Sequence, residues 1–196
     1  MKKQIVTSLL YMVVTAVVLG VVYPLVVTGL AHLLFAKQAD GQLIRRNGVV
    51  VGSHLIGQPF SGPGYFWSRP SAAGTGYDAA NSGGSNLGPT NKDLAARVAA
   101  SVAALNPKGA NGAAPSEVPI DLATDSGSGL DPDISPAAAL YQVGRVATER
   151  HASEDAVRAL VAAHVTPRQF GLLGEPRVNV LELNLDLDRM TQGPAK

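Results

Sequence analysis

An uncharged segment at the amino terminus constrains the fold of this chain more than any other feature of its sequence. No Asp, Glu, Lys or Arg occurs from Gln4 to Ala36, and lysines flank this run at positions 2, 3 and 37. A helix that crosses the hydrocarbon core of a bilayer needs about 20 mostly apolar residues. We therefore predict a short tail over residues 1–4, one transmembrane helix over 5–36 and a soluble domain over 37–196.

A cleaved signal peptide is the alternative for this segment. Signal peptides have an apolar stretch of about 7–15 residues before a small-x-small cleavage site, whereas this stretch is longer and ends in HLLFAK. A retained anchor is therefore favoured. Lys2, Lys3 and the terminal amine favour a cytoplasmic N-terminus with the domain outside, while Lys37, Arg45 and Arg46 favour the reverse. On balance we expect the N-terminus in the cytoplasm.

Small residues recur at every fourth position along the apolar segment. They are Ala16, Gly20, Pro24 and Thr28. Small residues on one face of a membrane helix let another helix approach closely, so these four predict a packing face for a partner. The plainer explanation is that Ala, Gly and Thr are common in any membrane helix. Pro24 lacks the N–H that a helix interior uses, and we expect a kink there.

The rest of the chain has the size and composition of one globular domain. About 160 residues follow the anchor, which is an ordinary size for a single domain. The chain of 196 residues has a formal net charge of +1, which argues against a nucleic-acid-binding function. It contains no cysteine, so disulfides are excluded.

Periodicity and turn residues predict an α+β domain with a small sheet and three to four helices. Asn47-Gly48 favours a tight β-hairpin turn within residues 43–51. Helices are expected after the N-caps Thr90, Ser135 and Ser153, the first of them stopping at Pro107.

Alternating apolar residues predict two further strands, over residues 118–124 and 177–184. In the second segment, a short terminal helix capped by Asn184 is the alternative.

The segment 61–90 is too long for a simple connection between two elements. Loops of this length are usually functional or disordered, and disordered segments are poor in aromatic residues. Here Phe60 and the segment hold five of the chain's ten aromatic residues, so we expect an ordered loop. Tyr65, Phe66, Trp67 and Arg69 are the predicted docking residues for a partner, with Arg69 stacked on a ring. A satellite core beneath the loop, with nothing bound, is the alternative.

Motifs that carry chemistry are missing from the sequence. It has no G-x-x-x-x-G-K-[ST] phosphate loop, no G-x-S-x-G nucleophile elbow, no H-E-x-x-H and no cysteine pair. We therefore expect no catalytic residue and no metal site. One segment suits a backbone nest for an anion or phosphate: Ser82, Gly83, Gly84, Ser85 and Asn86. Asp and Ser oxygens between 125 and 133 suit a hard cation, but turns and helix capping explain them better.

Five segments, in order along the chain, resemble the C subunit of the Kdp-type potassium-transporting P-type ATPase. They are VVYPLVVTGL (21–30), GSHLIGQPFSGPGYFWSRPSA (52–72), NSGGSNLGPTN (81–91), VPIDLATDSGSGLDPDISPAAALYQVGRVA (118–147) and GEPRVNVLELNLDLD (174–188). Together they cover nearly the whole chain. Two positions depart from the family pattern: Asp125 stands where a small residue is expected, and Asp133 where His or Asn is common.

The resemblance implies an accessory, non-catalytic subunit of a high-affinity potassium uptake pump in the cell inner membrane. Its partners would be a potassium-selecting, channel-like subunit, an ATP-hydrolysing P-type subunit and membrane lipid. It would be needed for assembly and stability, and would act as a catalytic chaperone that raises the ATP affinity of the hydrolytic subunit. Potassium is then transported by the complex and ATP is its ligand, with no cofactor held firmly by this chain. The chain lacks the Asp-Lys-Thr-Gly phosphorylation motif of P-type pumps.

The implied role raises the question of whether ATP touches this chain. The nest at 82–86 and a second run, Ser126, Gly127, Ser128 and Gly129, are the residues that would meet the nucleotide. A domain outside the cytoplasm excludes such contact, so we expect ATP affinity to be controlled through the membrane helices. A membrane-anchored extracytoplasmic enzyme or ligand-binding module using loops 61–90 and 125–136 is the alternative.

Overall fold

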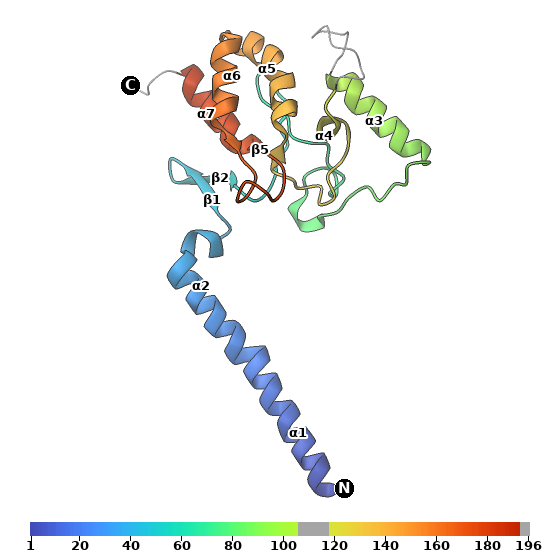
Figure 1. Ribbon diagram of the computed structural model, residues 1–196, viewed down its shortest axis with the longest axis vertical. Coiled ribbons are helices and arrows are strands. Elements are labelled where there is room, and N and C mark those ends of the chain that lie inside the picture. Colours follow the sequence, from blue (N-terminus) through green and yellow to red (C-terminus); the bar gives the residue numbers. More distant parts are fainter. Residues whose placement is uncertain (106–117, 193–196) are drawn as a thin grey trace. The chain divides into compact units, whose positions relative to one another are not determined.

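The computed structural model describes residues 1–105 and 118–192, and the chain divides into two compact units, Met1–Ser53 and His54–Lys196. Unit 1 is a long helix followed by a hairpin (Figure 1). The helix comprises α1 (Lys2–Val17), the π-helical turn η1 (Val18–Val22) and α2 (Tyr23–Ala39). This helix contains the predicted span 5–36 and is long and apolar enough to cross a membrane. Its apolar side chains, such as Leu19 and Leu33, are exposed within the unit, as lipid contact requires.

Pro24 is accommodated by a wider turn. The N–H of Tyr23 donates to the carbonyl of Val18, five residues earlier. Pro24 has no N–H to donate, and in a regular α-helix its ring would meet the carbonyl of Gly20. The π-helical turn lies directly before the proline and widens the helix at this point. A second irregularity lies at Phe35, whose φ of −139° and ψ of 43° depart from helical values.

The predicted hairpin is confirmed. Strand β1 (Leu43–Arg46) pairs antiparallel with β2 (Val49–Ser53). Asn47 and Gly48 both have positive φ, 51° and 80°, as a tight hairpin turn of this type requires.

The described part of unit 2 combines a three-stranded sheet with five α-helices. After the 3-10 turn η2 (Ala79–Asn81) come α3 (Lys92–Leu105), α4 (Ile120–Ala123), β3 (Asp133–Ile134), α5 (Pro136–Arg150), α6 (Glu154–Ala163), β4 (Val165–Thr166), β5 (Arg177–Asn179) and α7 (Val180–Gln192). The antiparallel sheet has the order β3-β5-β4. Helices α5, α6 and α7 pack together beside it (Figure 1). The α+β prediction is therefore confirmed.

Two predicted N-caps are confirmed and one is wrong. The hydroxyls of Ser135 and Ser153 accept from the N–H groups of Ala138 and Ala156, at the starts of α5 and α6. Helix α3 begins at Lys92, and the side chain of Asn91, not Thr90, accepts from the N–H of Asp93. The predicted stop at Pro107 lies outside the described residues.

The strand predicted over 118–124 is wrong, because residues 120–123 form the single helical turn α4. The turn aims the Asp121 carboxylate at Ser135, accepting from its N–H at 2.7 Å and its hydroxyl at 3.2 Å. These two hydrogen bonds from Ser135 to Asp121 favour the helical turn over the strand that the alternating apolar residues predicted.

The strand predicted over 177–184 ends at Asn179, where α7 begins. The Asn179 side chain accepts from the N–H of Glu182 at 3.1 Å and so caps the helix. Buried positions then follow helical spacing: Val180, Leu183, Asn184, Leu187 and Asp188. Asn184 lies inside α7, so the alternative that it caps a terminal helix is also wrong.

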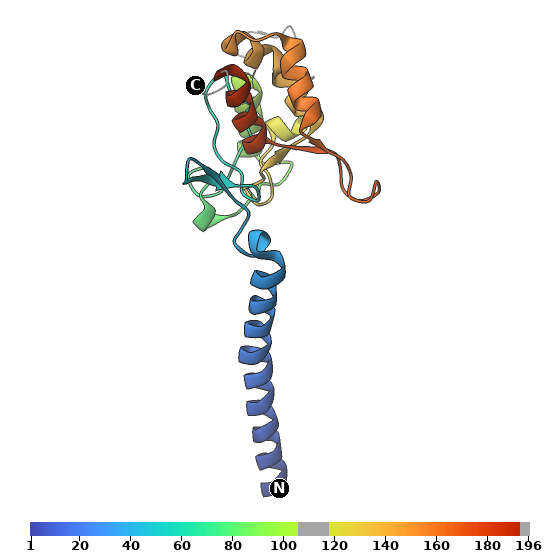
Figure 2. The same ribbon diagram turned by 90° about the vertical axis from the view of Figure 1, so that its left-hand side faces the viewer.

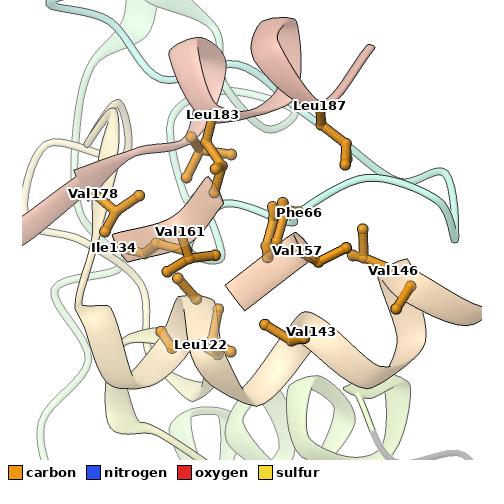
Figure 3. Packing of buried hydrophobic residues seen from close by; sticks show 14 of the residues in the cluster. Phe66, Leu122, Ile134, Val143, Val146, Val157, Val161, Val178, Leu183 and Leu187 are labelled. Atoms are coloured by element: carbon orange, nitrogen blue, oxygen red, sulfur yellow. The ribbon is translucent and has the colours of Figure 1, made fainter. Parts of the chain in front are cut away.

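The core of unit 2 receives a side chain from the long loop. Phe66 is fully buried among residues from α5, α6 and α7. Figure 3 shows it pointing into the same interior as Val143, Val157 and Leu183. The loop therefore joins the main core, and no separate satellite core is needed to explain its aromatic residues.

Two buried amide side chains hold this part of the loop extended. The Asn184 amide accepts from the N–H of Phe66 and donates to its carbonyl, both at 2.9 Å. The Gln142 amide does the same for Trp67, at 2.7 and 3.1 Å. Each amide takes the place of a neighbouring strand, so the N–H and C=O groups of two consecutive residues are paired without a sheet. We call this pair of contacts the amide clamp.

We expect Asn184→Ala to destabilise the protein by about 2–4 kcal/mol, because both backbone groups of Phe66 lose their partner inside the core. Urea unfolding of the full chain in detergent micelles measures this through the fluorescence of Trp67, the single tryptophan.

The matched control on the same helix is Arg189→Ala. It removes an exposed ion pair with Asp186 and is expected to cost less than about 1 kcal/mol. Equal losses in the two variants would contradict the amide clamp.

Candidate functional site

Two arginines of α5 cover the aromatic residues of the long loop. The Arg145 guanidinium lies 4.2 Å from the centre of the Trp67 ring and donates to the carbonyls of Pro63 and Tyr65. Burial lowers the pKa of Arg145 to about 10, which still leaves it charged at neutral pH. Arg150 lies 4.3 Å from the centre of the Tyr65 ring. The segment is thus tied to α5 by cation–π contacts and by hydrogen bonds.

Arg150 also connects the loop to α7. Its Nε donates to the carbonyl of Gly64 at 2.7 Å, and it forms an ion pair with Asp188 at 2.9 Å. Both charged side chains of this pair are largely buried.

These contacts correct two parts of the docking prediction. Arg69 does not stack on a ring, since it forms an ion pair with Asp131 at 3.0 Å. Phe66 is 0% exposed and cannot present its ring to a partner. Tyr65 and Trp67 are half-buried against their own arginines, and their docking role stays a prediction.

The two predicted nucleotide segments lie against each other. The N–H of Gly83 and the hydroxyl of Ser82 both donate to the carbonyl of Ser128, at 2.9 Å each. A Cβ on Gly84 would lie 3.0 Å from the carbonyl oxygen of Gly127. The two segments, about 45 residues apart in sequence, thus form one unit that we call the paired loops.

Gly129 is the closest point of the paired loops. Its φ is +66°, and a Cβ there would lie 2.7 Å from the backbone N of Ala73 and from the carbonyl oxygen of Gly83. Only a glycine meets both requirements without displacement of its neighbours.

Ser71 joins the paired loops and was missed by the sequence reasoning. Its hydroxyl donates to the carbonyl of Gly129 at 2.6 Å and accepts from the N–H groups of Ala73 and Tyr77, at 3.2 and 2.8 Å. The Tyr77 hydroxyl donates to the carbonyl of Arg69, and burial raises the pKa of this tyrosine to about 12. The only local sequence signal for this role of Ser71 was its place at the start of a Gly-rich turn.

The carboxylates of the 125–133 loop each face an arginine. Asp125 pairs with Arg97 of α3 at 2.8 Å, and Asp133 pairs with Arg177 of β5 at 3.1 Å. Asp131 pairs with Arg69, as above. Burial raises the pKa of Asp133, and Arg177 partly offsets that effect. The two acidic departures from the family pattern are therefore accompanied by basic partners within the chain.

The hydroxyls suggested as cation ligands in this loop are also engaged or buried. Ser128 accepts from the N–H of Leu130 at 3.1 Å, and Ser126 is buried. Within residues 1–105 and 118–192, no group of three or more His, Cys, Asp or Glu side chains is placed to hold a metal ion.

A pocket of about 310 Å³ lies beside the paired loops. It is lined mainly by apolar side chains, including Phe60, Trp67 and Leu105, with Arg69 and Tyr77 among its polar residues. The nest residues 82–86 do not line it. The structure thus separates the pocket from the predicted nucleotide segments.

On the helix of unit 1, the residues Ala16, Gly20, Pro24 and Thr28 are all exposed. Residues four apart drift by about 40° around a regular α-helix. The wider turn at Val18–Val22 offsets part of this drift. Their role as a packing face stays a prediction.

Over the described residues, these features define a class: an α+β protein with one helix able to span a membrane and with loops joined to each other by hydrogen bonds. The family model described as "K+-transporting ATPase, c chain" (KdpC) matches residues 5–189. Proteins named potassium-transporting ATPase KdpC subunit are similar over nearly their full length. That of Koribacter versatilis is 61% identical over 96% of this chain and 95% of its own. That of Acidobacterium capsulatum is 60% identical over 94% and 97%. That of Burkholderia cenocepacia is 57% identical over 96% and 97%.

The chain therefore belongs to the KdpC family, the c chains of potassium-transporting ATPases. The resemblance of the five sequence segments is confirmed.

We expect Gly129→Ala to separate the paired loops and to destabilise the protein by about 2 kcal/mol or more, since it adds both a positive-φ cost and a steric clash. Gly127→Ala is the matched control two residues away: its Cβ would meet nothing within 4 Å. It should change stability by less than about 0.5 kcal/mol. Hydrogen exchange of residues 71–84 should accelerate in the first variant alone. Equal exchange in both would contradict the close approach at Gly129.

Proposed function

We propose that this chain is the accessory, non-catalytic subunit of a high-affinity, ATP-driven potassium uptake pump. In this role it assists assembly and raises the ATP affinity of the subunit that hydrolyses ATP. The observation that carries the proposal is the family match over residues 5–189, which includes both the anchor and the domain.

The hydrogen bonding of polar groups in the paired loops supports a non-catalytic role. A catalytic group needs a free polar atom aimed at a substrate. In the paired loops, the Ser82 and Ser71 hydroxyls and the Gly83 N–H are bound within the domain. The sequence also lacks the Asp-Lys-Thr-Gly motif, so the phosphorylated aspartate of the pump belongs to a partner.

The proposed partners are a potassium-selecting, channel-like subunit and the ATP-hydrolysing P-type subunit. The helix of unit 1 supplies the anchor in the inner membrane, surrounded by lipid and by partner helices. The face with Ala16, Gly20, Pro24 and Thr28 is the proposed contact, since small side chains allow close helix approach.

Control of ATP affinity is proposed to be indirect, with the N-terminus in the cytoplasm and the domain outside it. The charges around the paired loops support this route. Asp78, Asp125 and Asp131 outnumber Arg69 and Arg97, and the two arginines are already paired. The pKa of Asp78 is lowered by its hydrogen bond from Asn81, which keeps it negative. Neither of these two arginines is therefore left without a carboxylate partner to receive a triphosphate.

Indirect control needs only a difference in affinity between two states of the pump. A subunit that binds better to the conformation with high ATP affinity raises that affinity by the same coupling free energy. Direct contact of ATP with Ser82–Asn86 and Ser126–Gly129 is the competing route and requires the opposite orientation.

A second candidate function rests on the pocket beside the paired loops. Its size of about 310 Å³ and its aromatic lining suit a small, mostly apolar ligand. An anchored ligand-binding module would bind through residues 38–196 in the absence of the pump.

We expect Gly20→Leu to weaken assembly of the pump, because a larger side chain prevents close approach at the proposed face. The readouts are the amount of P-type subunit that co-purifies with the tagged chain, and the ATP KM of the purified complex. Co-purification should fall several-fold, and the ATP KM of the remaining preparation should rise.

The matched control is Gly29→Leu, in the same helix but off the four-residue spacing and also with nothing within 4 Å. It should leave both readouts unchanged. An unaffected complex with Gly20→Leu would remove this face from the interface.

A further inference from the structure

The hairpin of β1 and β2 is joined to the end of the long helix by a closed backbone turn, and Figure 2 shows it following directly on that end. The N–H of Gln42 donates to the carbonyl of Lys37 at 2.9 Å, and the N–H of Gly41 donates to that of Gln38 at 3.1 Å. Gly41 has a φ of +77°, which completes the Schellman motif of a helix C-terminus. At the far end of β2, the Ser53 hydroxyl donates to the carbonyl of Gly41 at 2.7 Å. Both ends of the hairpin are therefore fixed beside the last turn of α2.

This turn places the base of the hairpin where the helix leaves a bilayer. The uncharged run from Gln4 to Ala36 spans about 50 Å as a helix. A bilayer with its headgroups is about 40–45 Å thick, and the usual tilt of a span shortens its reach. When this helix crosses a bilayer, Lys37, the first charged residue after the run, therefore reaches the headgroups. The backbone of Gln42, which is bonded to Lys37, reaches them with it.

One face of the hairpin combines apolar and basic side chains. Arg45 lies opposite Val50 in the register of the two strands. Leu43 lies two positions before Arg45 on the same strand, so these three side chains share a face. Leu43 is 46% exposed and Val50 43%, and Arg45 is exposed between them. Segments at a membrane surface bury apolar side chains at the acyl boundary and keep basic groups among the headgroups.

The charges near the end of the span favour phospholipid headgroups as the surface that this face meets. Between positions 37 and 53 the chain carries three basic side chains and one acidic one: Lys37, Arg45, Arg46 and Asp40. Basic residues next to a span attract anionic headgroups. Headgroup phosphates supply the opposite charge at this level, and the acyl boundary just beneath them accepts the apolar side chains.

We propose that the hairpin is a membrane-surface contact, in which Leu43 and Val50 enter the acyl boundary and Arg45 binds headgroup phosphates beside Lys37. The inference rests on the membrane anchor of the proposed function and adds a second, lateral contact with the same bilayer. It holds for either orientation of the chain, since both leaflets carry phosphates. Because the closed turn ties the hairpin to α2, the contact limits the tilt and rotation of the span.

The test uses the full chain, alone and in the purified pump complex, in vesicles of phosphatidylcholine and phosphatidylglycerol. The chain has no cysteine, so Val50→Cys gives a single site for the fluorophore NBD. A nitroxide on the lipid headgroup should quench NBD at position 50 at least five times more strongly than at the matched control, Ile120→Cys of α4, where Ile120 is 77% exposed. Equal quenching at the two positions would overturn the proposal. Loss of quenching at position 50 in the pump complex would also overturn it, because a protein would then cover the hairpin.

A third site, Leu19→Cys within the span, separates this inference from the proposed function. A nitroxide on the acyl chains should quench NBD at position 19 in the same vesicles. If position 19 is quenched and position 50 is not, the anchor stands and the surface contact fails. If position 19 is not quenched, the membrane anchor of the proposed function fails, and the surface contact fails with it.

The basic side chains are tested by Lys37→Gln combined with Arg45→Gln. This double variant should lower the headgroup quenching at position 50 at least threefold, because the attraction to anionic headgroups is lost. The matched control combines Arg158→Gln with Arg189→Gln, two exposed arginines of unit 2, and should leave the quenching unchanged. Unchanged Trp67 fluorescence during unfolding verifies that both double variants fold. Full quenching in the first double variant would overturn the binding of phosphates by Arg45.

Discussion

The arrangement of the soluble domain depends on two buried amides. Asn184 and Gln142, from α7 and α5, pair with the backbone of Phe66 and Trp67 as a neighbouring strand would. A chain segment without secondary structure normally stays at the surface, because its peptide groups need partners. The amide clamp satisfies these groups inside the protein and lets Phe66 enter the core. The buried Phe66 side chain in turn fixes the position of the first part of the long loop.

After Phe66, the loop is held in place by close contacts of its backbone with the 126–129 segment. Ser71 and Gly83 reach the 126–129 segment through hydrogen bonds, and Gly129 leaves no space for a side chain at their closest point. Two of the polar groups that looked available for a phosphate, the Ser82 hydroxyl and the Gly83 N–H, serve this contact. The Gly- and Ser-rich composition of these two segments is therefore explained by their tight packing against each other.

Local signals in the sequence were sufficient where one residue decides the conformation. Asn47-Gly48 gave the hairpin turn, and Ser135 and Ser153 gave two helix starts. Local signals were insufficient where a contact with a residue far away in the sequence decides the conformation. Alternation suggested a strand at 118–124, but Asp121 bridges to Ser135 in a helical turn. The pairing of Arg69 with Asp131, and the stacking of Arg145 on Trp67, join residues more than 60 positions apart. Gln142 interrupts an otherwise apolar face of α5, and Asn184 and Asp188 interrupt the apolar face of α7. These polar positions were the available clue to the amide clamp.

The proposed action of the domain on ATP affinity from outside the cytoplasm depends on the orientation of the chain in the membrane, which labelling measures most directly. The chain has no cysteine, so Ala99→Cys on the exposed side of α3 and Gln4→Cys at the start of the anchor give single reactive sites. A membrane-impermeant maleimide applied to intact cells should label position 99, and should label position 4 only after the membrane is permeabilised. Labelling of position 4 but not of position 99 in intact cells would contradict the account and return the paired loops to the side of the membrane where ATP is found.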